Sequence, residues 1–114
     1  MDIEQIRNEL RRFAGERHWD QFHSPKNLAT ALAVEAAELL EHFQWLTDAQ
    51  SETLRPEVRE QVTLEIADVF LYLVRLADKL DVDLIEAARR KLAINAEKYP
   101  VARARGSAKK YTEL

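Results

Sequence analysis

The sequence predicts an all-helical fold in a single domain. Only two glycines and three prolines occur in 114 residues, which leaves little turn chemistry for a β fold. Apolar residues instead recur at the three- and four-residue spacings of amphipathic helices in four segments. With 46% hydrophobic and 32% charged residues, the chain is typical of one globular domain. We expect that domain to cover residues 1–114, with a C-terminal tail from about residue 101.

The first expected helix covers the N-terminal segment. Apolar residues between Ile3 and Phe13 follow helical spacing, and Gly15 provides a stop signal. The next nine residues, ERHWDQFHS, are rich in aromatic side chains but lack a helical stripe. We therefore expect a packed loop from Glu16 to Ser24.

The second and third expected helices are the longest. Ser24 followed by Pro25 provides an N-cap with proline at the first helical position, and the apolar stripe continues to about Trp45. A polar connector, TDAQSETLR, then leads to Pro56, which can open a third helix that reaches about Leu80. These two helices should form the central pair of a bundle.

The fourth expected helix follows a short turn at residues 81–83. Asp83 can cap it, with Glu86 three residues on as in a capping box, and Pro100 ends it after Tyr99. Four helices in so short a chain leave broad helix faces to cover. We therefore expect a homo-oligomer, dimer or tetramer, that completes the bundle core.

Charge and cysteine content narrow the range of functions. A net charge of -3 gives no general attraction for nucleic acid, and the basic stretch near the C-terminus is a solvated tail or a segment that closes over an anion. Without cysteine there is no disulfide or thiolate metal site, which favours a reducing, cytoplasmic location. No signal peptide is apparent. The longest apolar stretch, Leu64 to Ala77, is shorter than the ~20 residues that cross a bilayer, so we expect no membrane segment.

Two pairs of acidic residues interrupt otherwise apolar helices. Glu35 and Glu38 occupy the apolar side of the second helix, and Glu65 and Asp68 interrupt the third, so each pair shares one helix face. Burying such charges without partners is costly, and Arg75 is the only basic residue on the apolar part of the third helix. Oxygen ligands without cysteine favour a hard divalent ion, Mg²⁺ or Mn²⁺. A solvated acidic face is the alternative.

Other carboxylate chemistry is less consistent with the pattern. Glu41 extends the acidic row and could be a metal ligand, a general base or an exposed rim charge. A di-iron bundle needs Glu-x-x-His on two helices, and the third helix contains no histidine. No glycine-rich phosphate loop is present, so a nucleotide would be held by metal and side chains.

The motif Glu35-x-x-Glu38 followed by Glu65-x-x-Asp68 resembles the signature of the MazG-like all-α nucleoside triphosphate pyrophosphohydrolases. The segments ERHWDQFHSPKNLATALAVEAAELLEHFQW, EIADVFLYLVRLAD, KLAINAEKYP and KKYTEL are similar to the dCTP pyrophosphatase branch of that family over almost the whole chain. The resemblance implies a four-helix MazG-like bundle. It also implies Mg²⁺-dependent hydrolysis of dCTP to dCMP and pyrophosphate, with a role in cleansing the nucleotide pool.

The resemblance also assigns residues. It implies that the four acids bind the metal, and either Glu38 or Glu41 would be the catalytic base. Trp19, Phe22, His23 and Trp45 would enclose the base, and Lys91 and Asn95, which Lys98 could join, would reach the phosphates. Asp20, Gln21 and Tyr72 would also bind the substrate. Each tryptophan could instead pack in the core.

Two departures from the vertebrate-type enzyme concern selectivity. Leu10 stands where that form has a histidine, and the connector after Trp45 is shorter. A dUTPase, an enzyme for modified nucleotides or a broad-range pyrophosphatase of the same fold therefore remains an alternative. A non-enzymatic helical adaptor, in which the acids form interhelical ion pairs, is an alternative of a different class.

Overall fold

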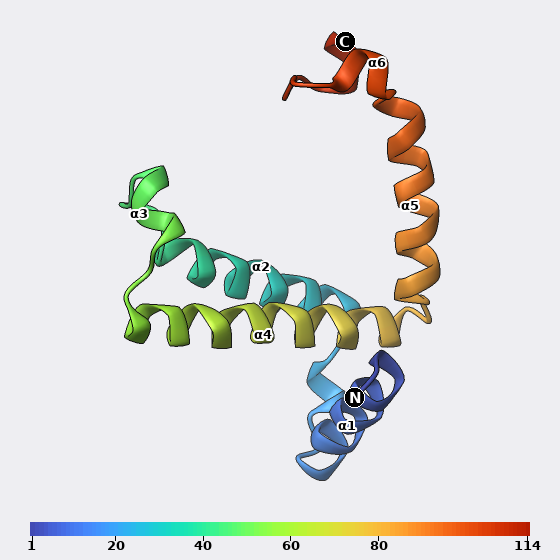
Figure 1. Cartoon of the computed structure of the whole chain (residues 1–114). Helices are drawn as coiled ribbons and strands as arrows, with labels where there is room; N and C mark the ends of the chain where they lie inside the picture. The colour runs from blue at the N-terminus through green and yellow to red at the C-terminus, as the bar shows by residue number, and fades with distance from the viewer. The chain divides into compact units, whose positions relative to one another are not determined.

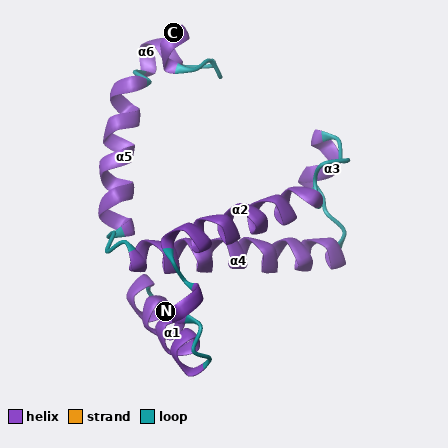
Figure 2. Cartoon of the chain, turned by 180° about the vertical axis from the view of Figure 1, so that it is seen from behind, coloured by secondary structure: helices purple, strands orange, loops and turns teal.

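The computed structural model describes all 114 residues and contains helices and connecting segments without a strand (Figures 1 and 2), which confirms the predicted all-helical fold class. In chain order, the elements are α1 (Ile3–Glu16), a 3-10 turn (Asp20–Phe22), α2 (Pro25–Glu41), α3 (Asp48–Glu52), α4 (Pro56–Lys79), α5 (Leu84–Lys98), α6 (Val101–Ala104) and a second 3-10 turn (Tyr111–Glu113). None of these helices has both the length and the apolar character that a membrane span requires.

The helix starts follow the local signals in the sequence. The Ser24 hydroxyl accepts a hydrogen bond from the Asn27 N–H at 3.1 Å, and Pro25 opens α2 as predicted. At α5, Asp83 accepts from the Glu86 N–H at 3.0 Å. The expected capping box there is only half formed, because the Glu86 carboxylate bonds to Arg89 instead. These caps satisfy N–H groups that the first helical turn leaves without partners.

The second helix ends earlier than predicted. Residues 42–45 form turns after Glu41, so Trp45 lies beyond α2 and not at its last turn. The polar connector is also more ordered than expected, because it contains α3. There the Thr47 hydroxyl accepts from the Gln50 N–H at 3.2 Å, while the Gln50 side chain accepts from the Thr47 N–H at 2.9 Å.

The chain divides into two compact units, residues 1–81 and 82–114. In the first unit, α2 and α4 run antiparallel side by side, and α1 packs on α4 (Figures 1 and 2). The expected central pair is therefore confirmed. The apolar residues buried in this unit are Ala14, Leu28, Val62, Val74 and Ala77. A single domain and a bundle completed by a second copy stay predictions.

The second unit consists of α5 and the C-terminal segment. The expected tail contains the short helix α6, and its end folds back onto the last turn of α5. Tyr111 packs edge-on against Tyr99 with 6.0 Å between ring centroids, and the Lys98 ammonium lies 4.8 Å from the Tyr111 ring centroid. The end of the expected tail therefore contacts α5 through Tyr111.

Candidate functional site

Three of the four predicted metal ligands lie together between α2 and α4. Glu35 and Glu38 come from successive turns of α2, and Glu65 comes from α4. One carboxylate oxygen from each lies within 4.8 Å of the other two. Asp68 is one turn further along α4, exposed and outside this group of three.

The three clustered carboxylates lack partners within the protein. One oxygen of Glu35 and one of Glu65 are buried without a hydrogen bond, and none of the four acids forms an ion pair. The pKa of Glu35 is raised to about 7, chiefly by burial and then by the neighbouring Glu38, Asp68 and Glu65. The absence of ion pairs contradicts the adaptor alternative, which required these acids to pair with basic residues.

This set of groups fits a hard divalent cation. Carboxylate oxygens are the ligands that Mg²⁺ and Mn²⁺ prefer, and the two unpartnered oxygens are buried where a cation would compensate them. A cation beside Glu35 would also reverse the effect of burial and like charge on its pKa. The cluster could therefore hold one divalent ion, with Asp68 available from the neighbouring turn.

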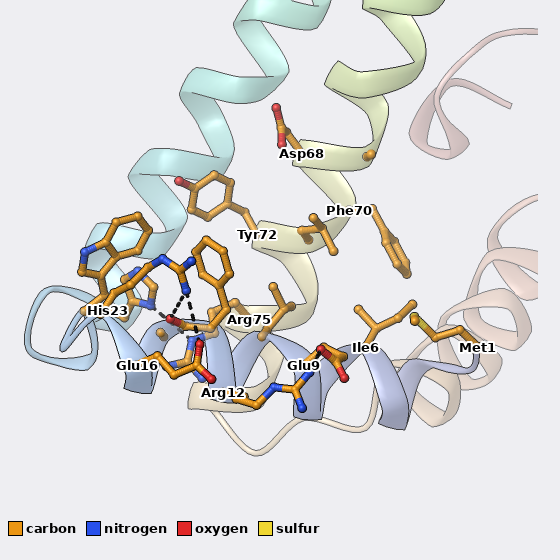
Figure 3. A pocket seen from close by; sticks show the side chains of 17 residues that line it. Met1, Ile6, Glu9, Arg12, Glu16, His23, Asp68, Phe70, Tyr72 and Arg75 are labelled. Carbon is orange, nitrogen blue, oxygen red and sulfur yellow. Dashed lines mark hydrogen bonds and ion pairs between the residues drawn. The ribbon is translucent and has the colours of Figure 1, made fainter.

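A cavity of about 710 Å³ lies next to Asp68 in the first unit (Figure 3). Its walls come from α1, the loop before α2 and the second half of α4. Asp68 and Tyr72 line it from consecutive turns of α4 (Figure 3), and Trp19 and His23 line it from the loop. Three predicted substrate-binding residues and one predicted metal ligand therefore share one cavity.

Aromatic contacts fix the loop wall of this cavity. The Trp19 ring packs edge-on against Phe13 of α1, with 5.6 Å between centroids, and against His23, with 6.2 Å. Phe22 is 60% exposed and does not line the cavity. Trp45 is 87% exposed and also lies outside it, so the core-packing alternative for Trp45 is wrong.

Two other predicted loop residues make contacts within the fold. Asp20 pairs with Arg75, and it accepts from the Lys79 ammonium at 3.2 Å. The bond from Lys79, followed by the charge of Arg75, lowers the pKa of Asp20 against the opposing effect of burial. The Gln21 side chain donates to the His18 carbonyl at 2.9 Å. Both contacts hold the loop, and a role of either residue in substrate binding stays a prediction.

The sequence did not identify Arg75 as part of this site. Its side chain is only 5% exposed, lines the cavity and reaches three groups. Its Nε–H donates to Nδ1 of His23 at 3.2 Å, and its terminal nitrogens bind Asp20 and Asp78. Asp20 and His23 are more than 50 positions away, so only the folded chain brings them to Arg75. The one signal in the sequence was a lone basic residue on an apolar helix.

Glu41 and the α5 residues lie outside the cluster. Glu41 is exposed at the last position of α2, one turn beyond Glu38. Lys91 and Asn95 are four residues apart and share one side of α5, while Lys98 lies over Tyr111. The approach of these three residues to the carboxylates stays a prediction.

Comparison with known proteins agrees with the sequence motif. The model of the MazG-like family matches residues 30–114. The dCTP pyrophosphatase 1 proteins of Rattus norvegicus and Homo sapiens are each 46% identical to this chain, over 98% of its length and 67% of theirs. A crystal structure of a pyrophosphatase from Archaeoglobus fulgidus is 44% identical, with a TM-score of 0.75 over 85% of this chain and 91% of that one. The paired acids, the helical fold and these matches together show that this chain belongs to the MazG-like family.

Proposed function

We propose that this protein hydrolyses dCTP to dCMP and pyrophosphate. The observation that carries this proposal is the cluster of Glu35, Glu38 and Glu65, with two buried oxygens that have no protein partner. Such a cluster suits a metal-assisted reaction at phosphate groups. The identity of about 45% to proteins named dCTP pyrophosphatase 1 supports cytosine as the base.

The ion proposed for the cluster is Mg²⁺, with Mn²⁺ as a substitute. Glu35, Glu38 and Glu65 would hold it, and Asp68 would be the fourth carboxylate. When bound, the ion supplies Lewis acidity at the phosphate oxygens and neutralises developing charge. A metal role for Asp68 also agrees with its effect on the pKa of Glu35, since the charge of Asp68 already reaches that carboxyl.

The attack on phosphorus needs a carboxylate that can accept a proton from water. Glu38 belongs to the clustered set, whereas Glu41 lies one turn along the same helix and is exposed. A carboxylate outside the cluster remains free to act as a base, so this arrangement favours Glu41 over Glu38. The spacing of three residues keeps Glu41 on the same side of α2 as Glu38.

The cavity beside Asp68 is the proposed site for the base. Trp19, His23 and Tyr72 line it, and a nucleobase can stack on their flat faces. Phe22 is exposed on the same loop and could close over the base from outside the cavity. Trp45 follows the opposite end of α2 from this loop, so its contact with the base stays a prediction. Lys91, Asn95 and Lys98 are proposed to contact the phosphates. Asp20 and Gln21 support the loop that carries Trp19 and His23.

A homo-oligomer is proposed because one copy of the chain leaves apolar helix surface uncovered. Ile66, Phe70 and Leu73 follow spacings of four and three on one side of α4, and they are 53%, 37% and 38% exposed. A second copy of the chain could cover this apolar face. The cytoplasmic location stays a prediction from the lack of cysteine.

The proposed reaction is tested by product analysis with a panel of nucleotides. The panel contains the deoxynucleoside and ribonucleoside triphosphates and 5-substituted dCTP, each with and without Mg²⁺. We expect dCMP and pyrophosphate only when the metal is present, with dCTP preferred. Release of orthophosphate and a nucleoside diphosphate would contradict the proposal, while a preference for dUTP or equal use of all bases would revise the substrate alone.

A further inference from the structure

The base site contains a histidine whose hydrogen-bonding state is set by a neighbour. His23 is half-buried and lines the cavity, and its Nδ1 lies 3.2 Å from Nε of Arg75. An arginine side chain carries five N–H donors, has no acceptor and stays protonated in proteins. Nδ1 of His23 must therefore accept this hydrogen bond, which requires a ring nitrogen without a proton.

The remaining nitrogen of the ring then carries the proton. A neutral imidazole has one N–H donor and one acceptor, so an accepting Nδ1 leaves the proton on Nε2. The His23 ring makes no other hydrogen bond in the protein. Its Nε2–H is therefore a donor without a protein partner on a residue that lines a cavity of aromatic, aliphatic and charged side chains.

Arg75 is held firmly enough to fix this state. Its side chain is only 5% exposed, and its other nitrogens bind Asp20 and Asp78. Burial, followed by the positive charge of Arg75, lowers the pKa of His23, which also favours the neutral ring.

We propose that Arg75 is a positioning residue for the base site, which holds His23 as a neutral Nε2–H donor toward an acceptor on the edge of the bound base. The inference rests on the function proposed above, since it assumes that the cavity takes a nucleobase. Cytosine offers two suitable acceptors, its O2 carbonyl and its N3 ring nitrogen. A base whose edge presents only donors to His23 would leave the Nε2–H without an acceptor. Such an unpaired polar group weakens binding and so discriminates between ligands.

The protonation state of His23 can be measured without any turnover. Long-range ¹H–¹⁵N correlation spectra of the full chain, free of metal and nucleotide at neutral pH, distinguish the two neutral tautomers and the imidazolium. The chain has three histidines, so His18→Gln and His42→Gln variants assign the signals. We expect the Nε2–H tautomer for His23. An imidazolium or an Nδ1–H tautomer in the wild-type protein would overturn the proposal.

Two variants test the role of Arg75, and a third is the matched control. Arg75→Lys keeps the charge but lacks the planar fork that serves three partners, and Arg75→Met removes every donor. Both should allow the Nδ1–H form of His23 to appear. Arg11→Met removes another arginine that binds Asp78 but makes no contact with His23, so the tautomer should not change. Retention of the pure Nε2–H form in the Arg75 variants would contradict the proposal.

Kinetics distinguish positioning from a merely structural role. In Arg75→Lys we expect KM for dCTP to rise about threefold to tenfold, the loss typical of one hydrogen bond, with kcat changed by less than about twofold. KM for deoxyribose triphosphate, which lacks the base, should not change, and Arg11→Met should behave as wild type with both substrates. Equal losses for both substrates would contradict a role in base recognition.

The role of Arg75 can be tested even if the proposed reaction is wrong. If no triphosphate is hydrolysed with Mg²⁺, the assigned reaction is wrong, but dCTP can still be titrated into the labelled protein. A shift of the His23 Nε2 signal in the wild type that is lost in Arg75→Lys would support the inference. A signal that does not respond to dCTP would overturn it.

Discussion

The folded protein disfavours the charged form of Glu35. Its pKa is raised from an ordinary value of 4.5 to about 7 by burial and by the neighbouring carboxylates. The folded state therefore binds a proton more tightly at Glu35 than the unfolded chain does. This contribution to stability is fully present below about pH 4.5 and is lost as the pH rises through about 7.

We expect the metal-free protein to show this loss as a lower Tm at pH 7.5 than at pH 5. His23 acts in the opposite sense, because its pKa is lowered and its contribution to stability rises with pH. The difference in Tm between wild type and Glu35→Gln isolates the first effect, since the amide does not titrate. Saturating Mg²⁺ should remove the difference in pH dependence. A wild-type profile identical to that of Glu35→Gln without metal would contradict the raised pKa.

Trp45 offers a second test at the scale of one side chain. Because it is 87% exposed, Trp45→Ala should leave Tm nearly unchanged, in contrast to the loss of about 3 to 5 kcal/mol when a core aromatic is truncated. A stacked base contributes about 1 to 3 kcal/mol, so dCTP binding should weaken roughly tenfold to a hundredfold. Calorimetry with inorganic pyrophosphate is the control, because its affinity should not change. Equal losses for both ligands would remove Trp45 from the base site.

At the scale of elements, the pairing of α2 with α4 positions the carboxylates. Leu28 lies seven residues before Glu35 on α2 and is only 1% exposed. Two helical turns separate these residues, so the packing at Leu28 and the inward direction of Glu35 belong to one helix face. The acids meet because the apolar residues around them bury the same face.

Leu28→Ala should therefore destabilise the protein by about 2 to 5 kcal/mol, the usual cost of truncating a buried leucine. Leu92→Ala on α5 is the control, since Leu92 is 70% exposed and such substitutions usually change stability by less than about 0.5 kcal/mol. Chemical denaturation followed by circular dichroism measures both. A similar small loss in the two variants would show that α2 is not held by this contact.

Local signals predicted the starts of helices better than their ends. Ser24, Pro25 and Asp83 act through bonds to residues within four positions, so the sequence contains the whole interaction. The end of α2 was placed about four residues too late, because apolar and aromatic residues continue after Glu41 although the backbone turns. The start of α3 was missed although Thr47 and Gln50 form a capping box in the polar connector.

The candidate site could be predicted only where its geometry is local. Glu35 and Glu38 share a face because of helical spacing, and the apolar surroundings of Glu65 predicted that it would turn toward them. The same reasoning predicted that Asp68 would join the other three acids as a metal ligand. In the structure, its side chain is exposed and lines the cavity. The bond between Arg75 and His23 joins residues 52 positions apart. No periodicity in the sequence encodes such a contact.

At the scale of the whole molecule, one copy buries few apolar side chains. Only five hydrophobic residues are buried, while Ile66, Phe70 and Leu73 remain exposed on one side of α4. An apolar row of this kind on a helix that already packs against two others is typical of an interface. The homo-oligomer predicted from the sequence therefore has a specific face on α4 to test.

We expect Ile66→Glu to dissociate the oligomer, because a buried, unpaired carboxylate in an apolar interface costs several kcal/mol. Sedimentation velocity should show the wild type as a dimer or tetramer and the variant as a monomer at the same concentration. Leu64→Glu is the matched control. Leu64 is 58% exposed on the same helix, but a separation of two residues places it about 200° around the axis from Ile66. Dissociation by Leu64→Glu alone would move the interface to the opposite side of α4, and a monomeric wild-type protein would contradict the predicted oligomer.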